Sequence, residues 1–599
     1  MSPIQQMLLG VGAVATKTYV DDVFSIDVFT GNGSNDGAAG TQKTITNGID
    51  LSTHGGLLWG KERTRSQAHN LFDSVRGISE ANSPKISSDE ADGQNNRAKS
   101  ITSFNTNGYS LGSSAYGNPA HPICYWSFRK APGFFDVVSY TGNGTSGRTI
   151  SHSLDGTVGS LWVKCTSDAK HWACWHRGLN GGSPTGYALR LNSNSDQFPG
   201  NGYFPSNPST SNFTVGSVDE VNGNGKTYVA YIFGQDIQVF GENEDKGIID
   251  CGEYTGNGNA TGPSIDCGWE PQWVLIKRVD GFENWFLWDS MRGIVTGGND
   301  ARLIPNSNGA ENDTTDRIDL TSQGFQPKTS SGEVNASGGK YFYMAIRRPD
   351  GYVGKPPELG TDVFAIDAAG NGSSTVPAFD SGFPVDMRIA KKPAAESEWW
   401  VGSRLMQGYH LATNLSDLQN TTSYSAFDSN VGEGKNWTSV YQAWMWKRHA
   451  GFDTVTWTGN NASTRNINHS MNNIPQMIWV KLRTSTSGYN WAVYHKDVVV
   501  SPNFYELVLN NNEKQTTADN YNGAFGGVPT STQFTVKGGT MANGNNKTYI
   551  AMLFGSVDGI SKVGSYTGNG SSTGPVISLG FTPRFIMFKN ANSNGNGWL

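Results

Sequence analysis

The chain has 599 residues, of which 75 are Gly and only 16% are charged. Soluble domains average about 7% Gly and about 25% charged residues. Loops rich in Asn, Ser and Thr therefore replace charge on the surface, which is typical of secreted or virion β proteins. The formal net charge of −6 is close to neutral for this length, which excludes an electrostatic case for nucleic-acid binding. No stretch approaches the roughly 20 apolar residues of a membrane-spanning helix.

Residues 1–23 differ from everything that follows. The opening Ser2-Pro3 carries helix-start signals. A secretory signal peptide is the alternative, because Ala13-Val-Ala15 resembles a cleavage site, but no Lys or Arg precedes the short apolar run. We interpret the segment as a docking peptide that binds another protein. The residues expected to make that contact are Ile4, Met7, Leu8 and Leu9.

One short phrase recurs along the chain and organises it. Its occurrences are Phe29-Thr-Gly-Asn-Gly33, Tyr140-Thr-Gly-Asn-Gly144, Tyr254-Thr-Gly-Asn-Gly258, Ala369-Gly-Asn-Gly372, Trp457-Thr-Gly-Asn-Asn461 and Tyr566-Thr-Gly-Asn-Gly570. Most steps are roughly 110 residues, whereas solenoid units run about 20–50 residues. Each occurrence therefore marks one copy of a small domain.

The copies pair at a higher level: one matches four, two matches five and three matches six. For example, copy two closes with the run 226–234 and copy five with the similar run 547–555. This pairing indicates a three-domain cassette that was duplicated. The final Asn-Gly-Trp matches an early part of copy three, so we expect the chain to be a fragment of a longer protein.

Short apolar runs within each copy are separated by turn residues. Runs such as Phe213-Thr-Val215 alternate apolar and polar residues, the period of a half-buried strand. About eight short strands in about 110 residues fit a two-sheet antiparallel sandwich, jelly-roll or lectin-like in outline. The sequence predicts an all-β tandem array of about six such domains behind the docking segment. The expected boundaries are 24–136, 137–249, 250–360, 361–452 and 453–562, with 563–599 as the start of a sixth repeat.

Two recurrent features could bind anions. A Gly-rich loop cradles phosphate when a helix follows it, but Gly-Asn-Gly lies between expected strands, so a tight turn with positive φ is favoured. A Lys also ends the next apolar run in most copies. An exposed charge at a strand end is favoured over an anion site, because Lys is normally exposed. These residues are Lys61, Lys164, Lys277, Lys481 and Lys589.

Aromatic pairs follow the Lys: Trp172 with Trp175, Trp285 with Trp288, and Trp491 with Tyr494. Exposed Trp faces stack on sugars, so a lectin site is one interpretation, but recurrence favours core packing. Residues three apart on a strand face opposite sides, so at most one of each pair is expected to be buried.

Two copies continue with an Asp and an Arg three residues apart, Asp73 with Arg76 and Asp289 with Arg292. They could pair across a turn, and an exposed ion pair contributes only about 0–1 kcal/mol. A catalytic carboxylate is disfavoured because copy two has His176 in this place.

The five Cys share no spacing from copy to copy, which argues against a disulfide framework or a zinc site. We expect free, buried thiols in a chain folded in a reducing cytoplasm, with Cys165 and Cys174 nearest to each other. The residues are Cys124, Cys165, Cys174, Cys251 and Cys267. No metal, cofactor or catalytic residues are predicted.

With its opening Met1-Ser-Pro-Ile-Gln-Gln-Met-Leu-Leu-Gly10, the joint at Thr16-Lys-Thr-Tyr-Val-Asp-Asp-Val-Phe24 and the Tyr-Thr-Gly-Asn-Gly repeats, the chain resembles tail-fibre and related tail structural proteins of marine cyanobacterial phages. The resemblance implies an N-terminal anchor on a tail hub, adaptor or nozzle protein, a body that projects toward the host, and a homotrimer. It implies no catalytic motif. The chain departs from fibres with long coiled-coil or β-helix shafts, so it resembles beads on a string or a decorating tail protein.

The leading hypothesis is therefore a virion attachment protein that contacts a host surface receptor, with a glycan as one candidate. A purely structural or decorating tail component is the second hypothesis. A glycan-degrading tailspike-like enzyme is a lesser one, because it would need paired carboxylates in a groove. A bacterial adhesin would need the missing export signal.

Overall fold

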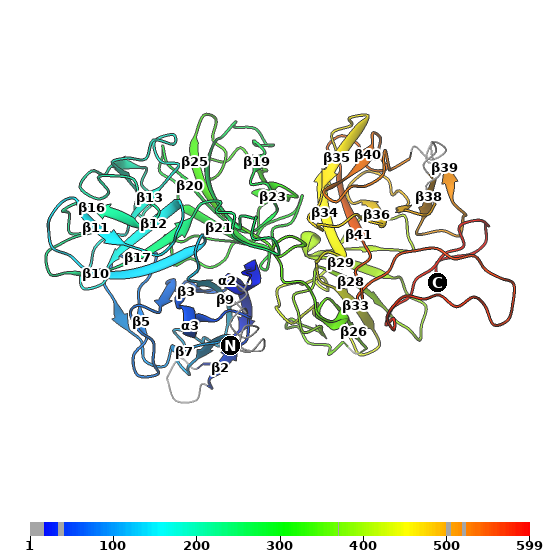
Figure 1. Ribbon diagram of the computed structural model, residues 1–599, viewed down its shortest axis with the longest axis horizontal. Helices are drawn as coiled ribbons and strands as arrows, with labels where there is room; N and C mark the ends of the chain where they lie inside the picture. The colour runs from blue at the N-terminus through cyan, green and yellow to red at the C-terminus, as the bar shows by residue number, and fades with distance from the viewer. Residues whose placement is uncertain (1–16, 34–40, 369, 499–504, 518–522) are drawn as a thin grey trace, which may run out of the picture.

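The computed structural model describes residues 17–33, 41–368, 370–498, 505–517 and 523–599. The protein is nearly all β, so the predicted all-β array of antiparallel sandwiches is confirmed. Figure 1 shows two lobes side by side, with repeats one to three in the left lobe and the later repeats in the right lobe. The short helices among these residues are α2 (Val20–Val23), α3 (Leu51–His54), η1 (Gly360–Asp362) and η2 (Arg404–Met406).

Each of the first five repeats has one main antiparallel sheet, in which the last strand of the repeat lies between its first strand and a central strand. In repeat one the order is β1 (Phe24–Thr30), β9 (Pro122–Arg129), β3 (Gly56–Glu62), β4 (Asn70–Asp73). In repeat two it is β10 (Phe135–Thr141), β17 (Thr227–Gly234), β12 (Val158–Cys165), β13 (Ala173–His176). In repeat three it is β18 (Ile249–Thr255), β25 (Lys340–Arg347), β20 (Pro271–Arg278), β21 (Trp285–Asp289), β22 (Arg302–Leu303).

Repeats four and five extend the same sheet by further strands. In repeat four the order is β26 (Phe364–Asp367), β33 (Gln442–Trp446), β28 (Met387–Lys391), β29 (Trp400–Ser403), β30 (Tyr409–Ala412), β31 (Asn420–Thr421). In repeat five it is β34 (Phe452–Thr458), β41 (Thr548–Phe554), β36 (Met477–Leu482), β37 (Ala492–His495), β38 (Tyr505–Val508), β39 (Thr516–Thr517). Residues 563–599, all described, carry no strand.

A smaller second sheet accompanies each main sheet. These are β2 (Lys43–Ile45), β8 (Gly108–Leu111) and β7 (Ile101–Asn105); β11 (Arg148–Ser151) and β16 (Asn212–Val215); β19 (Ile265–Asp266), β24 (Gly324–Pro327) and β23 (Ile318–Thr321); β27 (Phe379–Asp380) and β32 (Gly432–Glu433); β35 (Thr464–Asn468) and β40 (Gln533–Lys537). Two further hairpins are β5 (Pro84–Lys85) with β6 (Asn95–Asn96), and β14 (Tyr187–Ala188) with β15 (Phe198–Pro199).

The Gly-Asn-Gly phrase is a tight turn after the first strand of the repeat. Gly144 has φ +70°, a conformation that Gly adopts at no steric cost. A buried Asn from the far end of the repeat holds the turn: Asn222 Oδ1 accepts from the Asn143 amide at 3.0 Å, and Asn222 Nδ2 donates to Asn143 Oδ1 at 3.1 Å. The expected turn is confirmed, but its partner was not predicted. The equivalent buried residues are Asn118, Asn335 and Asn543.

The main sheets bury both of their faces. In repeat two, Trp175 packs in the core between the two sheets of its own sandwich, whereas Trp172, on the other face, packs in a core shared with other repeats. Both are at most 3% exposed, so the expectation that only one Trp of each pair is buried is wrong. The reason is that a second layer, made by neighbouring repeats, covers the outer face of the sheet.

The shared core joins repeats one, two and three. Trp59 and Trp162 pack edge to face at 5.9 Å between ring centroids, Trp162 and Trp285 at 6.4 Å, and Phe128 and Trp273 at 6.1 Å. Each of the three repeats thus contacts the other two. The first lobe is a closed three-domain unit, not a string of independent beads.

Candidate functional site: the joints between repeats

In repeats two, three and five the recurrent Lys joins its repeat to the one before, whereas Lys61 bonds to Glu62 O and Arg65 O of its own repeat. Lys164 Nζ donates to Lys170 O in its own repeat at 2.6 Å and to Ala91 O in repeat one at 2.8 Å. Lys277 and Lys481 reach back in the same way to Asn194 O and Ser416 O, at 3.2 and 2.7 Å. The side chains have no exposed surface. The prediction of an exposed strand-end charge is wrong for these three residues, because each strand ends against the preceding repeat instead of in water.

The first Trp of each aromatic pair makes a second joint. Trp172 Nε1 donates to Ser87 O of repeat one at 2.8 Å, Trp285 Nε1 to Arg190 O of repeat two at 3.1 Å, and Trp491 Nε1 to Ala412 O of repeat four at 2.8 Å. Each indole therefore extends beyond its own repeat and binds the backbone of the repeat before it. Core packing is confirmed for these residues, and they are not free to stack on a sugar.

In repeat one, His69 occupies the position that Trp172 has in repeat two, and it connects repeat one to repeat three. Its Nδ1 accepts from Trp59 Nε1 at 3.0 Å, so Nε2 carries the proton and donates to Ile304 O of repeat three at 3.1 Å. Arg63 supports the same contact, with its guanidinium 2.8 Å from Glu311 Oε1. Repeat three is thus bonded back to repeat one.

The Asp-Arg pairs form as predicted, but they are buried and face another repeat. Arg76 Nε donates to Asp73 Oδ2 at 2.6 Å, and Tyr231 Oη of repeat two donates to the same oxygen at 2.7 Å. Asp289 is bound in the same way by Arg292 Nε, at 2.6 Å, and by Trp126 Nε1 of repeat one, at 2.9 Å. The prediction that these ion pairs are exposed and contribute little to stability is wrong, since the acceptor Asp is fully buried at each site.

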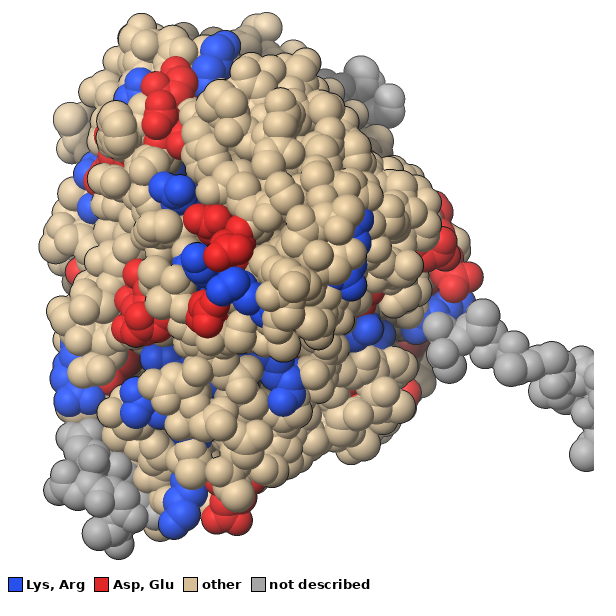
Figure 2. Space-filling model, turned by 90° about the vertical axis from the view of Figure 1, so that its left-hand side faces the viewer, with Lys and Arg blue, Asp and Glu red and all other residues tan. Residues whose placement is uncertain are grey.

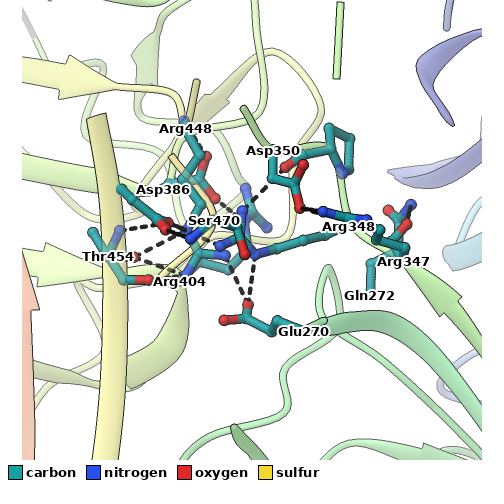
Figure 3. A network of polar contacts seen from close by, with 12 residues as sticks. Glu270, Gln272, Arg347, Arg348, Asp350, Asp386, Arg404, Arg448, Thr454 and Ser470 are labelled. Atoms are coloured by element: carbon teal, nitrogen blue, oxygen red, sulfur yellow. Dashed lines mark hydrogen bonds and ion pairs between the residues drawn. The ribbon is translucent and has the colours of Figure 1, made fainter. Parts of the chain in front are cut away.

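Figure 3 shows the joint between the two lobes, a network of buried charges. Arg448 Nη1 of repeat four donates to Glu270 Oε1 of repeat three at 2.7 Å. Arg348 Nη2 of repeat three donates to Asp453 Oδ1 of repeat five at 2.8 Å. These four side chains are at most 6% exposed, and two negative charges balance two positive ones. Burial opposes ionisation of Asp453, but Arg348 and Arg448 outweigh it and hold its pKa below the ordinary value.

The predicted docking residues Ile4, Met7, Leu8 and Leu9 lie outside the described residues. The described part of the segment is fixed to the first lobe: the Val20 amide donates to Val353 O at 2.9 Å, and Thr18 O accepts from the Gly241 amide at 2.9 Å.

The described residues hold no group of His, Cys, Asp or Glu suited to a metal ion and no helix able to span a membrane. All five Cys are free. Cys165 and Cys174 lie on paired strands but face different cores.

The described residues line open hollows, among them one of about 420 Å³ and one of about 350 Å³. The first lies beside the N-terminal segment and is lined by residues including Lys17 and Arg129. The second lies between the lobes and contains Asp319, which Lys328 and the Gly297 amide engage. In Figure 2, positive and negative side chains lie interspersed over the end of the first lobe.

The protein family described as "Domain of unknown function (DUF7483)" matches residues 20–348 and 433–599, most of the chain. The chain belongs to the DUF7483 family. The stretch of this DUF7483 member that the family does not match, 349–432, includes most of repeat four and part of the joint between the lobes. No curated protein matches the chain. The nematode sperm cell motility protein MFP2B is similar over 72% of this chain and 100% of its own, at 11% identity and a TM-score of 0.12, which carries no argument.

The buried Lys joints should make stability depend on pH. Burial lowers the pKa of Lys277 to about 7, against about 10.4 for a free Lys. Between these values the unfolded chain binds more protons, so stability rises with pH by up to about 1.4 kcal/mol per pH unit from this group.

We therefore expect the stability difference between wild type and Lys277→Met to shift in favour of wild type as pH rises from about 7 to about 9, measured by urea unfolding. Lys340→Met, at an exposed Lys of the same repeat, is the matched control and should show no such trend. A difference for Lys277→Met that does not change with pH would contradict the assignment.

Proposed function

We propose that this DUF7483 chain is a structural protein of a phage tail: a fibre held at the tail by residues 1–23, whose repeats project for host attachment. The strongest support is the set of buried joints. They bond repeat to repeat and lobe to lobe, so a force at the far end is carried by packed sheets to the N-terminal segment. The resemblance of the opening residues and of the repeats to phage tail proteins supplies the context.

The contacts of residues 17–23 support the anchor proposal. Residues 18 and 20 bond to repeats two and three, and Val20 and Val23 are fully buried in the shared core. In the sequence, the docking residues thus come just before a segment that is bonded to the first lobe. The proposed partners are a tail hub, adaptor or nozzle protein at this end, sister copies in a homotrimer, and a host surface receptor, with assembly in the host cytoplasm.

A decorating tail component without host contact is the second candidate. The observation that favours it is the closed three-domain lobe, which is thicker than a string of single domains. We propose no enzymatic role for the chain as a fibre or as a decorating component. The recurrent side chains described above are engaged in contacts between repeats.

Replacing Ile4, Met7, Leu8 and Leu9 together with Ser tests the anchor. Burying apolar surface contributes roughly 25 cal/mol per Å². Replacing the four apolar side chains with Ser would therefore remove the driving force for binding to a hub protein. We expect the variant chain to fold normally but to be missing from purified particles, as judged by mass spectrometry. A variant with Ser at Val440 and Val528, both exposed in the second lobe and far along the chain from the anchor, is the control and should assemble normally.

Anchor-variant protein present in particles at wild-type occupancy would refute the docking role. If particles that lack the whole chain adsorb to host cells normally, attachment is refuted and the decorating role remains.

A further inference from the structure

Arg483 of repeat five is a buried cation that has no carboxylate partner in the described part of the chain. It follows β36 directly, and it has no exposed surface. Its Nε donates to Gln419 Oε1 of repeat four at 2.7 Å, but Nη1 and Nη2 have no hydrogen-bond partner among the described residues. Burial lowers the pKa of Arg483 to about 10, so the guanidinium still carries its positive charge at neutral pH.

The other buried Arg residues that the structure describes all pair with a carboxylate, at 2.6–3.4 Å. The closest comparison is Arg388, which also has no exposed surface and whose Nε is 3.0 Å from Glu433 Oε1. A charge that is buried without a partner is costly, so Arg483 needs a different source of negative charge. The residues that have a carboxylate partner are Arg292, Arg347, Arg348, Arg388, Arg404 and Arg448.

The guanidinium of Arg483 lies where three repeats meet. Gln419 belongs to repeat four, and the Arg483 amide donates to Thr548 O, in the last strand of repeat five, at 2.8 Å. Gly297 of repeat three lies against the same Thr548, because a Cβ on this Gly would be 3.2 Å from Thr548 Cγ2. Repeats three, four and five are each complete, so the junction is built without any part of the sixth repeat.

Asp319 of repeat three is the carboxylate whose charge opposes the lowering of the Arg483 pKa, but other groups bind it. Its Oδ1 accepts from the Gly297 amide at 2.7 Å, and its Oδ2 is 3.3 Å from Lys328 Nζ. The charges of Asp319 and Lys328 balance, so the positive charge of Arg483 is left over. Its two terminal nitrogens present N–H donors in a planar fork, a geometry suited to an anion.

We propose that Nη1 and Nη2 of Arg483 bind one small inorganic anion, chloride, at the junction of repeats three, four and five. The ion supplies the negative charge that a carboxylate supplies at the other buried Arg residues. Arg483 lines neither of the hollows described above, so the site suits an ion of a single atom and not phosphate or an organic acid. Chloride then stabilises the contact between the two lobes. The site does not depend on the tail function proposed above, so either can fail alone.

Hydrogen exchange of the full wild-type chain tests the site without a mutation. The Gln419 amide, which donates to Arg483 O, and the Arg483 amide report on opening of the junction. Chloride is titrated against gluconate, as sodium salts at constant ionic strength. An ion that binds only the closed junction slows exchange by one plus the ratio of its concentration to Kd, about elevenfold at ten times Kd. Amides of β10 and β17 in repeat two control for general salt effects and should not change.

Arg483→Met removes the cation and should abolish the chloride dependence of stability, measured by urea unfolding in the same two salts. Arg177→Met, at an exposed Arg of repeat two, is the matched control and should respond to chloride as wild type does.

Exchange of the Gln419 and Arg483 amides that is independent of chloride would overturn the proposal, and buried water would then be the partner of the two nitrogens. Equal chloride responses of the wild type and of Arg483→Met would also overturn it. So would a response of the wild type to phosphate that is larger than its response to chloride.

Discussion

Arg448→Met should loosen the contact between the two lobes by about 3–5 kcal/mol, the usual cost of removing one partner of a buried ion pair. The guanidinium is 2.7 Å from Glu270 and donates to the Thr454 carbonyl at 2.6 Å. Its loss leaves Glu270 buried with Arg348 as its remaining cation. Hydrogen exchange of β25 and β34, which flank the network, measures the free energy of local opening.

The control for this variant is Lys496→Met. Lys496 pairs with Asp497 at 3.1 Å, but both side chains are partly exposed. Exposed pairs contribute about 0–1 kcal/mol, so the exchange rates of β25 and β34 should not change. An effect of Arg448→Met no larger than that of the control would mean that the network does not hold the lobes together.

Trp285→Ala should destabilise the first lobe by about 3–5 kcal/mol, the range for removing a large core aromatic. The ring has no exposed surface, packs on Trp162 and Phe342, and donates to Arg190 O. Because it lies between repeats two and three, we expect both repeats to lose exchange protection together. Loss confined to repeat three would contradict a shared core.

Trp399→Ala is the matched control, because Trp399 holds the same sequence position in repeat four. It is 39% exposed and stacks on Trp444 at 5.6 Å. Its removal should cost clearly less than that of Trp285. Thermal unfolding of the two variants, measured side by side, gives the comparison.

Local patterns in the sequence are sufficient to predict the β class, the repeats and the Gly-Asn-Gly turn. Strand periodicity and turn chemistry act over a few residues, and Gly144 with its φ of +70° is the direct outcome. The buried Asn222 was missed because it comes from the far end of the repeat. Its recurrence just before the last strand, as Asn335 and Asn543, was the available signal.

The joints could not be read from residue type alone. Lys is normally exposed, and only the neighbouring repeat, with its loop carbonyls at Ala91 and Asn194, makes burial of Lys164 and Lys277 possible. The same holds for Trp172, since a strand in an isolated sandwich would leave that face open. Recurrence of a Lys and a Trp at fixed positions was the sign that something other than solvent lies against them.

A density map of the intact phage particle tests the central claim, a tail protein anchored by its N-terminus. We predict that both lobes are found on the tail, with the end that carries Thr18 and Val20 against a tail protein and the second lobe pointing away. Particles that contain no copy of the chain, or a chain attached through its second lobe, would contradict it.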